Sequence, residues 1–139
     1  MPIPATLMAA SLLGFVLLVL AWRCVAMRGQ LAKLEEAGDE AGEARAAAEA
    51  ELAHRGRVMA NFTEYTPFLL IQLGALELAG TATGVAFLLA GLIVLARVMH
   101  AWGYGRSSGR SAGRYWGTLL SWLLIAGQSL LGLYCLLIA

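Results

Sequence analysis

Apolar residues in this chain form four long runs, and shorter polar segments separate them. A helix needs about 20 mainly apolar residues to cross the hydrocarbon core of a bilayer. Four stretches approach or exceed that length, at residues 5–27, 60–80, 82–102 and 116–139. The pattern predicts an all-α integral membrane protein that folds as a four-helix bundle, with the whole chain of 139 residues in one domain.

Composition supports a membrane location and argues against two other classes of function. The chain is 60% hydrophobic and 14% charged, with a mean hydropathy of +0.72, which is too apolar for a soluble domain of this size. Acidic residues gather between Glu35 and Glu51, where they would repel nucleic-acid phosphates, so we expect no nucleic-acid partner. No second His or Cys lies at ligand spacing from His100, so we also expect no metal site.

Most basic residues lie between the first and second runs and between the third and fourth runs. They are Arg28, Lys33, Arg45, Arg55 and Arg57 in the first group, and Arg106, Arg110 and Arg114 in the second. Because Lys and Arg favour the cytoplasmic side, both groups are expected there, with both termini outside. We therefore expect a multi-pass protein of the bacterial inner membrane.

The polar segment at residues 28–57 is expected to lie in the cytosol. Within it, residues 43–56 are rich in Ala and in oppositely charged pairs, which favours a helix leading into the second span. Gly38, Asp39 and Gly42 mark the break before that helix.

Two polar stripes interrupt the apolar runs at helical spacing. Arg57, Asn61 and Glu64 begin the second run, and Arg97, His100 and Tyr104 end the third. At about 100° per residue, each set shares one side of its helix. Ionisable groups at membrane depth are costly and usually mark a functional site. Since the second span enters where the third span exits, the topology predicts that both stripes meet at the cytoplasmic side.

The chemistry of the two stripes suits a zwitterionic ligand. Arginines bind carboxylates through paired, charge-assisted hydrogen bonds, and Glu64 can pair with an amine. Glutathione, with two carboxylates and one ammonium, matches that set. A structural alternative stays open, in which Glu64 forms an ion pair with Arg57 or Arg97 and ties the spans together. Two further polar residues are expected to act outside the site. Gln72 is expected to bond another helix, and Glu77, near the outer end, is expected to cap or pair locally or to snorkel outward.

Three segments carry a family resemblance: RVMANFTEYTPFLL (57–70), LELAG (76–80) and ARVMHAWGYG (96–105). In these segments the chain resembles the membrane-associated proteins in eicosanoid and glutathione metabolism, the MAPEG family, and especially its small bacterial members. The resemblance extends over residues 5–137. Its most specific part is the combination of R-x-x-x-N-x-x-E-x-x-P in the second span with R-x-x-H in the third.

The resemblance implies a homotrimer that binds glutathione between neighbouring subunits on the cytosolic side. It assigns glutathione contacts to both stripes: Arg57, Asn61, Glu64, Arg97, His100 and Tyr104. Arg28 corresponds to a further arginine in helix one. Arg114 is the nearest match to the arginine that polarises the glutathione sulfur, with Arg106 and Arg110 as alternatives.

The resemblance further implies a glutathione transferase or peroxidase, in which a thiolate attacks lipophilic electrophiles arriving from the bilayer. The alternative is a non-catalytic, lipid-binding or scaffold protein of the same fold. A small multidrug exporter also has four spans, but it depends on a glutamate in the first span, and residues 5–23 contain no acid.

Overall fold

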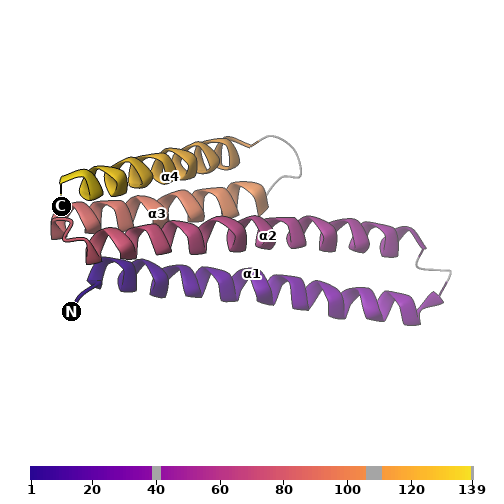
Figure 1. Ribbon diagram of the computed structural model, residues 1–139. Helices are drawn as coiled ribbons and strands as arrows, with labels where there is room; N and C mark the ends of the chain where they lie inside the picture. The colour runs from indigo at the N-terminus through magenta and orange to yellow at the C-terminus, as the bar shows by residue number, and fades with distance from the viewer. Residues whose placement is uncertain (39–41, 106–110, 139) are drawn as a thin grey trace.

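The computed structural model describes residues 1–38, 42–105 and 111–138, which form four helices (Figure 1). The helices are α1 (Pro4–Glu36), α2 (Gly42–Leu78), α3 (Thr83–Gly105) and α4 (Ala112–Ile138). Successive helices run antiparallel, and both termini lie at one end of the bundle (Figure 1). The prediction of an all-α, four-helix membrane bundle is confirmed.

α2 and α3 form the central pair of the bundle. α1 packs against both of them, and so does α4, whereas α1 and α4 do not touch each other within the described residues. Small side chains line the interior, including Ala5 and Ala9 on α1 and Ala86 and Ala90 on α3, all at most 1% exposed. Small residues repeated at this spacing let membrane helices approach closely.

Large apolar side chains cover the outside of the bundle, which is the arrangement expected in a bilayer. Phe15 and Trp22, for example, are each 69% exposed. By length and hydropathy, α1, α4 and the Thr83–Gly103 part of α3 are long and apolar enough to cross a membrane. The predicted second span lies in the later part of α2, a helix that also carries the first polar stripe and Glu77. Its role as a fourth span stays a prediction.

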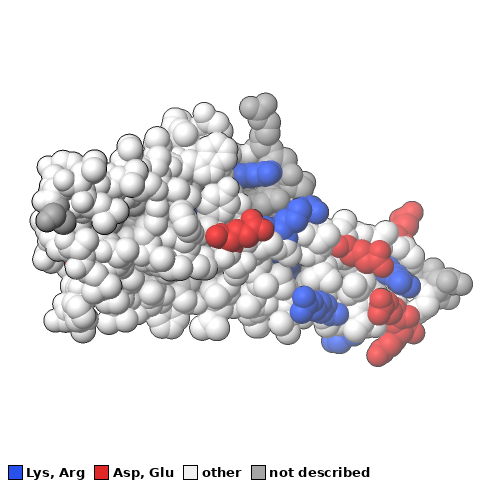
Figure 2. Space-filling view, in the orientation of Figure 1, with Lys and Arg blue, Asp and Glu red and all other residues white. Residues whose placement is uncertain are grey.

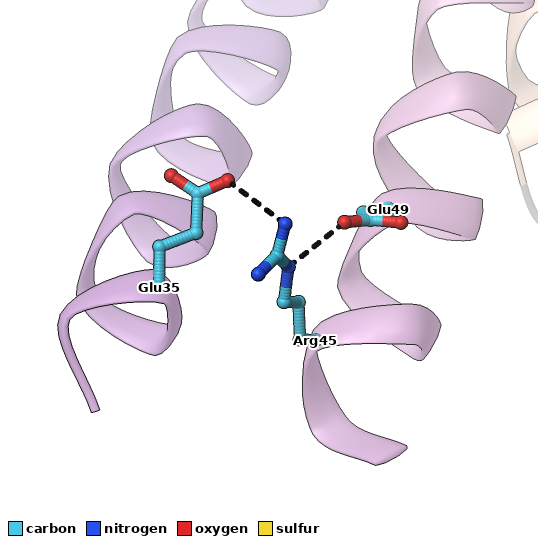
Figure 3. A network of polar contacts seen from close by, with 3 residues as sticks. All are labelled: Glu35, Arg45 and Glu49. Carbon is cyan, nitrogen blue, oxygen red and sulfur yellow. Dashed lines mark hydrogen bonds and ion pairs between the residues drawn. The ribbon is translucent and has the colours of Figure 1, made fainter. Parts of the chain in front are cut away.

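α1 and α2 project beyond α3 and α4 as an antiparallel hairpin, and charged side chains gather there (Figures 1 and 2). α1 continues to Glu36 and α2 begins at Gly42, so the helix predicted at residues 43–56 is confirmed as the first part of α2. Arg45 on α2 joins the two helices through an ion pair with Glu35 of α1 at 3.7 Å, and it also pairs with Glu49, one turn along α2, at 3.0 Å (Figure 3). We call this end of the bundle the hairpin end.

At the opposite end, Glu77 of α2 caps the N-terminus of α1. Its carboxylate accepts hydrogen bonds from the backbone N–H groups of Ala5 and Thr6, at 3.0 and 2.8 Å, and from the Thr6 hydroxyl at 2.6 Å. α1 has no side-chain cap of its own, because Ile3 occupies that position. Of the roles expected for Glu77, the structure shows the cap, and the helix that it caps is a neighbouring one and not its own.

Glu77→Ala is expected to lower the free energy of unfolding by about 1–2 kcal/mol, since it leaves two first-turn N–H groups and one hydroxyl without their acceptor. Thermal unfolding in detergent, followed by tryptophan fluorescence, measures the loss. Glu77→Gln keeps one carbonyl oxygen at the site and should lose less. An alanine variant as stable as the parent protein would contradict this role for the carboxylate.

Candidate functional site

Arg97 on α3 is the centre of the candidate site. Its side chain is 1% exposed, yet it reaches both neighbouring helices. Nη2 donates to the backbone carbonyl of Asn61 at 3.1 Å and to Asn61 Oδ1 at 2.9 Å, while Nη1 donates to Ser121 Oγ on α4 at 3.3 Å. The guanidinium also faces the rings of Phe62 and Tyr65, at 5.5 and 5.4 Å from their centroids. Arg97 therefore joins α2, α3 and α4 at one point.

This contact fixes the orientation of the Asn61 amide. Arginine has only donors, so the amide oxygen must face Arg97 and the amide NH₂ group must face away from it. Asn61 is partly buried, whereas Arg57 and Glu64 on the same helix are exposed. Arg97 thus holds a pair of amide donors in place beside an exposed cation and an exposed carboxylate.

The two stripes meet through one residue of each, not along their whole length. Arg97 contacts Asn61, but none of the ion pairs found among the described residues includes Arg57, Glu64 or Arg97. All of them lie in the hairpin, where Arg55 pairs with Glu51 at 2.6 Å. Within one protomer, the described residues therefore do not form the structural ion pairs that the sequence left open.

His100, one turn after Arg97, lies where α3 and α4 approach each other closely. Its side chain is 3% exposed. A Cβ atom placed on Gly117 of α4 would lie 2.6 Å from the His100 backbone nitrogen, and one on Gly103 would lie 2.5 Å from the Arg114 nitrogen. The absence of side chains at these glycines brings the backbone of His100 against α4 and fixes its position beside Arg97.

Gly117→Ala should separate α3 from α4 locally and lower the stability of the bundle by about 1–3 kcal/mol, because the new methyl group meets backbone atoms. Gly127→Ala is the matched control on the same helix, since a Cβ there meets nothing within 4 Å. Thermal unfolding of both variants, side by side, measures the difference. Equal thermal stability of the two alanine variants would contradict the close approach of α3 and α4 at Gly117.

Arg114 lines an open groove of about 460 Å³ at the start of α4. The groove is amphipathic: Ser111 and Thr118 contribute hydroxyl groups, and Tyr115 and Trp122 contribute aromatic surface. Below it, Trp122 Nε1 donates to Tyr65 Oη on α2 at 3.2 Å, and Gln72 Nε2 donates to Ser129 Oγ at 2.7 Å. The inter-helix bond predicted for Gln72 is confirmed, and these two bonds hold α4 against α2 beneath the groove.

The other predicted site residues lie at the edge of the described structure or outside it. Arg28 is exposed on α1, in the part that leads into the hairpin. Tyr104 belongs to α3, but its side chain lies outside the described residues, as do Arg106 and Arg110 entirely. In the part of the chain that the structure describes, no three His, Cys, Asp or Glu side chains come together as a metal-binding group.

Ser121 and Tyr65 take part in the site although the sequence did not single them out. Ser121 is 0% exposed and binds Arg97, while Tyr65 faces the Arg97 guanidinium and binds Trp122. A signal for Ser121 was present: Ser121 and Gln128 are two polar residues seven positions apart in an apolar run, which places them on one face of a helix. Tyr65 gave no such signal, because it directly follows Glu64 in a stretch that is already polar.

Of three comparisons with known proteins, one found a match. The model of the MAPEG family matches residues 6–134. No curated protein and no solved structure matches the chain.

Proposed function

The chain belongs to the MAPEG family, and on this basis we propose that it binds glutathione at the hairpin end of a homotrimer and transfers it to lipophilic electrophiles. One observation carries the proposal. Arg57 and Glu64 are exposed and form no ion pair with any residue that the structure describes, and they lie beside an Asn61 amide that the buried Arg97 holds in place. Opposite charges at this depth are costly unless a ligand or a second subunit covers them.

Each group has a role that follows from its chemistry. Arg57 binds a carboxylate of glutathione, Glu64 pairs with its ammonium group, and the Asn61 NH₂ group donates to a carbonyl or carboxylate oxygen. Arg97 acts as a positioning residue through Asn61. His100 and Tyr104 remain proposed contacts from α3, and Arg28 is the proposed contribution of a neighbouring subunit.

Arg114 is the proposed catalytic residue. A cation beside a thiol favours the thiolate and lowers its pKa from the free value of about 8.5. After the proton leaves, the sulfur attacks an electrophilic centre of a molecule that enters the groove from the bilayer, and the displaced group leaves with the bonding electrons. The aromatic and apolar lining beside Arg114 suits such a lipophilic substrate.

The proposed orientation follows the positive-inside rule. The hairpin and its arginines face the cytoplasm of a bacterium, where glutathione would enter the site, and both termini face outward. The same fold without catalysis, as a lipid-binding or scaffold protein, is the second candidate. The amphipathic groove beside Arg114 would serve it equally well, because lipid binding does not need a thiolate.

Glutathione titration of the purified protein in detergent, by calorimetry and by native mass spectrometry, tests the proposal. The parent protein should bind glutathione as a trimer at millimolar concentration or below. Glu64→Ala should weaken binding by about tenfold or more, since a charge-assisted hydrogen bond is lost. Absence of binding, together with no effect of Glu64→Ala or Arg114→Ala on transferase activity, would leave only the lipid-binding alternative.

A further inference from the structure

Exposed tryptophan side chains mark one level of the bundle near the hairpin end. Trp22 of α1, Trp102 of α3 and Trp116 of α4 are 69%, 63% and 55% exposed. Gly103 lies against Arg114 where α3 and α4 approach each other, so Trp102 and Trp116 lie at nearly the same height. Exposed tryptophans gather where the hydrocarbon of a bilayer meets the lipid headgroups. This level therefore marks that border.

Two arginines from different helices lie at the same level. The hydrogen bond between Arg97 and Asn61 fixes the relative heights of α3 and α2. Toward the hairpin, Trp102 lies about 7.5 Å beyond Arg97. Arg55 lies about 9 Å beyond Asn61 in the same direction, and its Nη1 donates to the backbone carbonyl of Arg23 on α1 at 3.0 Å. Arg23 and Arg55 therefore lie side by side, within about one helical turn of the tryptophan level. We call them the arginine pair.

The arginine pair is accessible and only partly neutralised. The side chain of Arg55 is 25% exposed and pairs with Glu51 at 2.6 Å. Arg23 is also partly exposed, and its guanidinium forms no hydrogen bond or ion pair with any residue that the structure describes. Two guanidinium groups and one carboxylate leave a net charge of +1 at this point. Figure 2 shows basic side chains where the uncharged surface of the bundle ends.

A large apolar surface of α1 begins one turn away from the arginine pair, on the side of the bilayer core. Phe15, Leu18 and Val19 belong to it and are 69%, 66% and 57% exposed. Val19 precedes Arg23 by four residues, so the two side chains lie on the same side of α1. Hydrocarbon chains attached to an anionic group at Arg23 would lie along this surface. The arrangement therefore favours a ligand that has both an anionic headgroup and acyl chains over a free phosphate ion.

We propose that Arg23 and Arg55 bind the phosphodiester group of an anionic phospholipid in the leaflet at the hairpin end. The guanidinium of Arg23 donates two parallel hydrogen bonds to phosphate oxygens. Nη2 of Arg55, which has no partner among the described residues, adds a further donor. Phosphatidylglycerol carries one negative charge, which balances the net charge of the arginine pair and Glu51. Phosphatidylcholine has the same phosphodiester but also a cation of its own, so it should bind more weakly.

Native mass spectrometry of the purified full chain in detergent tests the proposal, with phosphatidylglycerol and phosphatidylcholine added in equal amounts. The parent protein should retain phosphatidylglycerol about three- to tenfold more than phosphatidylcholine, which is the selectivity expected of one arginine at a membrane surface. Inorganic phosphate at millimolar concentration should not displace the lipid, because it lacks acyl chains. A phosphatidylglycerol with a photoreactive diazirine in one acyl chain should label α1 near Val19.

Three variants separate the arginine pair from the general positive charge of the protein. Arg23→Gln should lower the retention of phosphatidylglycerol to that of phosphatidylcholine, with little change in Tm, because the Arg23 guanidinium bonds no described residue. Arg55→Gln should have a smaller effect, since Glu51 already neutralises part of its charge. Lys33→Gln is the matched control: it removes the same charge from an exposed position of α1, about 15 Å further along the hairpin. It should keep the parent preference.

Three results would overturn the proposal. Equal retention of the two lipids by the parent protein, or an unchanged preference in Arg23→Gln, would remove Arg23 from lipid recognition. Equal losses in Arg23→Gln and Lys33→Gln would attribute the preference to overall charge. Displacement of the lipid by inorganic phosphate would show an anion site that does not use the acyl chains. No arm of the experiment contains glutathione, so its outcome is independent of the proposed transferase function.

Discussion

Replacing Arg97 by methionine is expected to weaken glutathione binding by about tenfold or more, although Arg97 is buried and does not reach the surface of the protomer. The loss arises at Asn61, whose amide oxygen accepts from the Arg97 guanidinium at 2.9 Å. Without that donor the amide is free to rotate, and its NH₂ group is no longer held toward the ligand. One misplaced hydrogen bond to a charged group accounts for a change of this size.

The effect of the same variant on stability should be smaller, because opposing terms nearly cancel. Burying a guanidinium costs several kcal/mol, even in a well-formed site. Its hydrogen bonds to Asn61 and Ser121, and its contacts with two aromatic rings, return a similar amount. Methionine fills much of the space without the desolvation penalty, so we expect the free energy of unfolding to change by less than about 2 kcal/mol.

Calorimetric titration with glutathione and thermal unfolding in the same detergent measure the two effects together. Arg97→Lys is the informative control. Lysine keeps the charge but lacks the planar fork that reaches Asn61 and Ser121 at once, so it should also bind glutathione weakly. A methionine variant that binds like the parent protein would show that Arg97 does not position Asn61. A methionine variant that fails to fold would show that the protein needs Arg97 mainly for stability.

The helices and their order could be predicted from the sequence because they depend on local patterns. Apolar runs predicted the helices, and the Ala-rich, charged segment at residues 43–56 predicted the hairpin part of α2. The inter-helix bond of Gln72 was also predicted, and a cap was one of the roles expected for Glu77, since an isolated polar residue in an apolar helix has few ways to be satisfied. Their partners, Ser129 and the first turn of α1, could not be named, because partners depend on how the helices pack.

The direction in which each stripe faces could not be derived in the same way. Helical periodicity gives the angle between Arg57, Asn61 and Glu64, but not the side of α2 that packs against α3. The structure places that boundary within the stripe: Asn61 turns inward to Arg97, and the two charged residues turn outward. The proposed site therefore consists of a buried contact between Arg97 and Asn61 and two exposed charged side chains, Arg57 and Glu64.

Replacing Arg114 by alanine is expected to lower transferase activity near neutral pH by about 100-fold, with a smaller effect on glutathione affinity. Removing one preorganised group that stabilises developing or full negative charge typically costs that much in rate. Arg114 lies in the first turn of α4 and lines a groove with aromatic surface, where we propose that the lipophilic substrate binds. Binding should largely survive, because the groups proposed to hold the carboxylates and the ammonium are on α2.

The pH dependence separates a thiol-activating role from a structural one. Only the thiolate reacts, so activity rises with pH through the pKa of the bound thiol. With Arg114 present, this rise should occur below the free-thiol value of about 8.5. Without the cation, the pKa of the bound thiol rises toward its free value. Arg114→Ala should therefore lose most activity near pH 7 and regain part of it as the pH approaches 9. The dependence of kcat on pH, measured for the parent protein and the variant, checks the shift.

Two further variants decide which arginine acts on the sulfur. Thr118→Val changes the same groove without removing charge, because the Thr118 hydroxyl bonds the Arg114 carbonyl in its own helix at 2.8 Å. It should keep the parent pH profile. Arg110→Ala tests the nearest alternative cation in the sequence. If Arg110→Ala moves the profile and Arg114→Ala does not, the activating cation is Arg110, and Arg114 lines the groove without acting on the thiol.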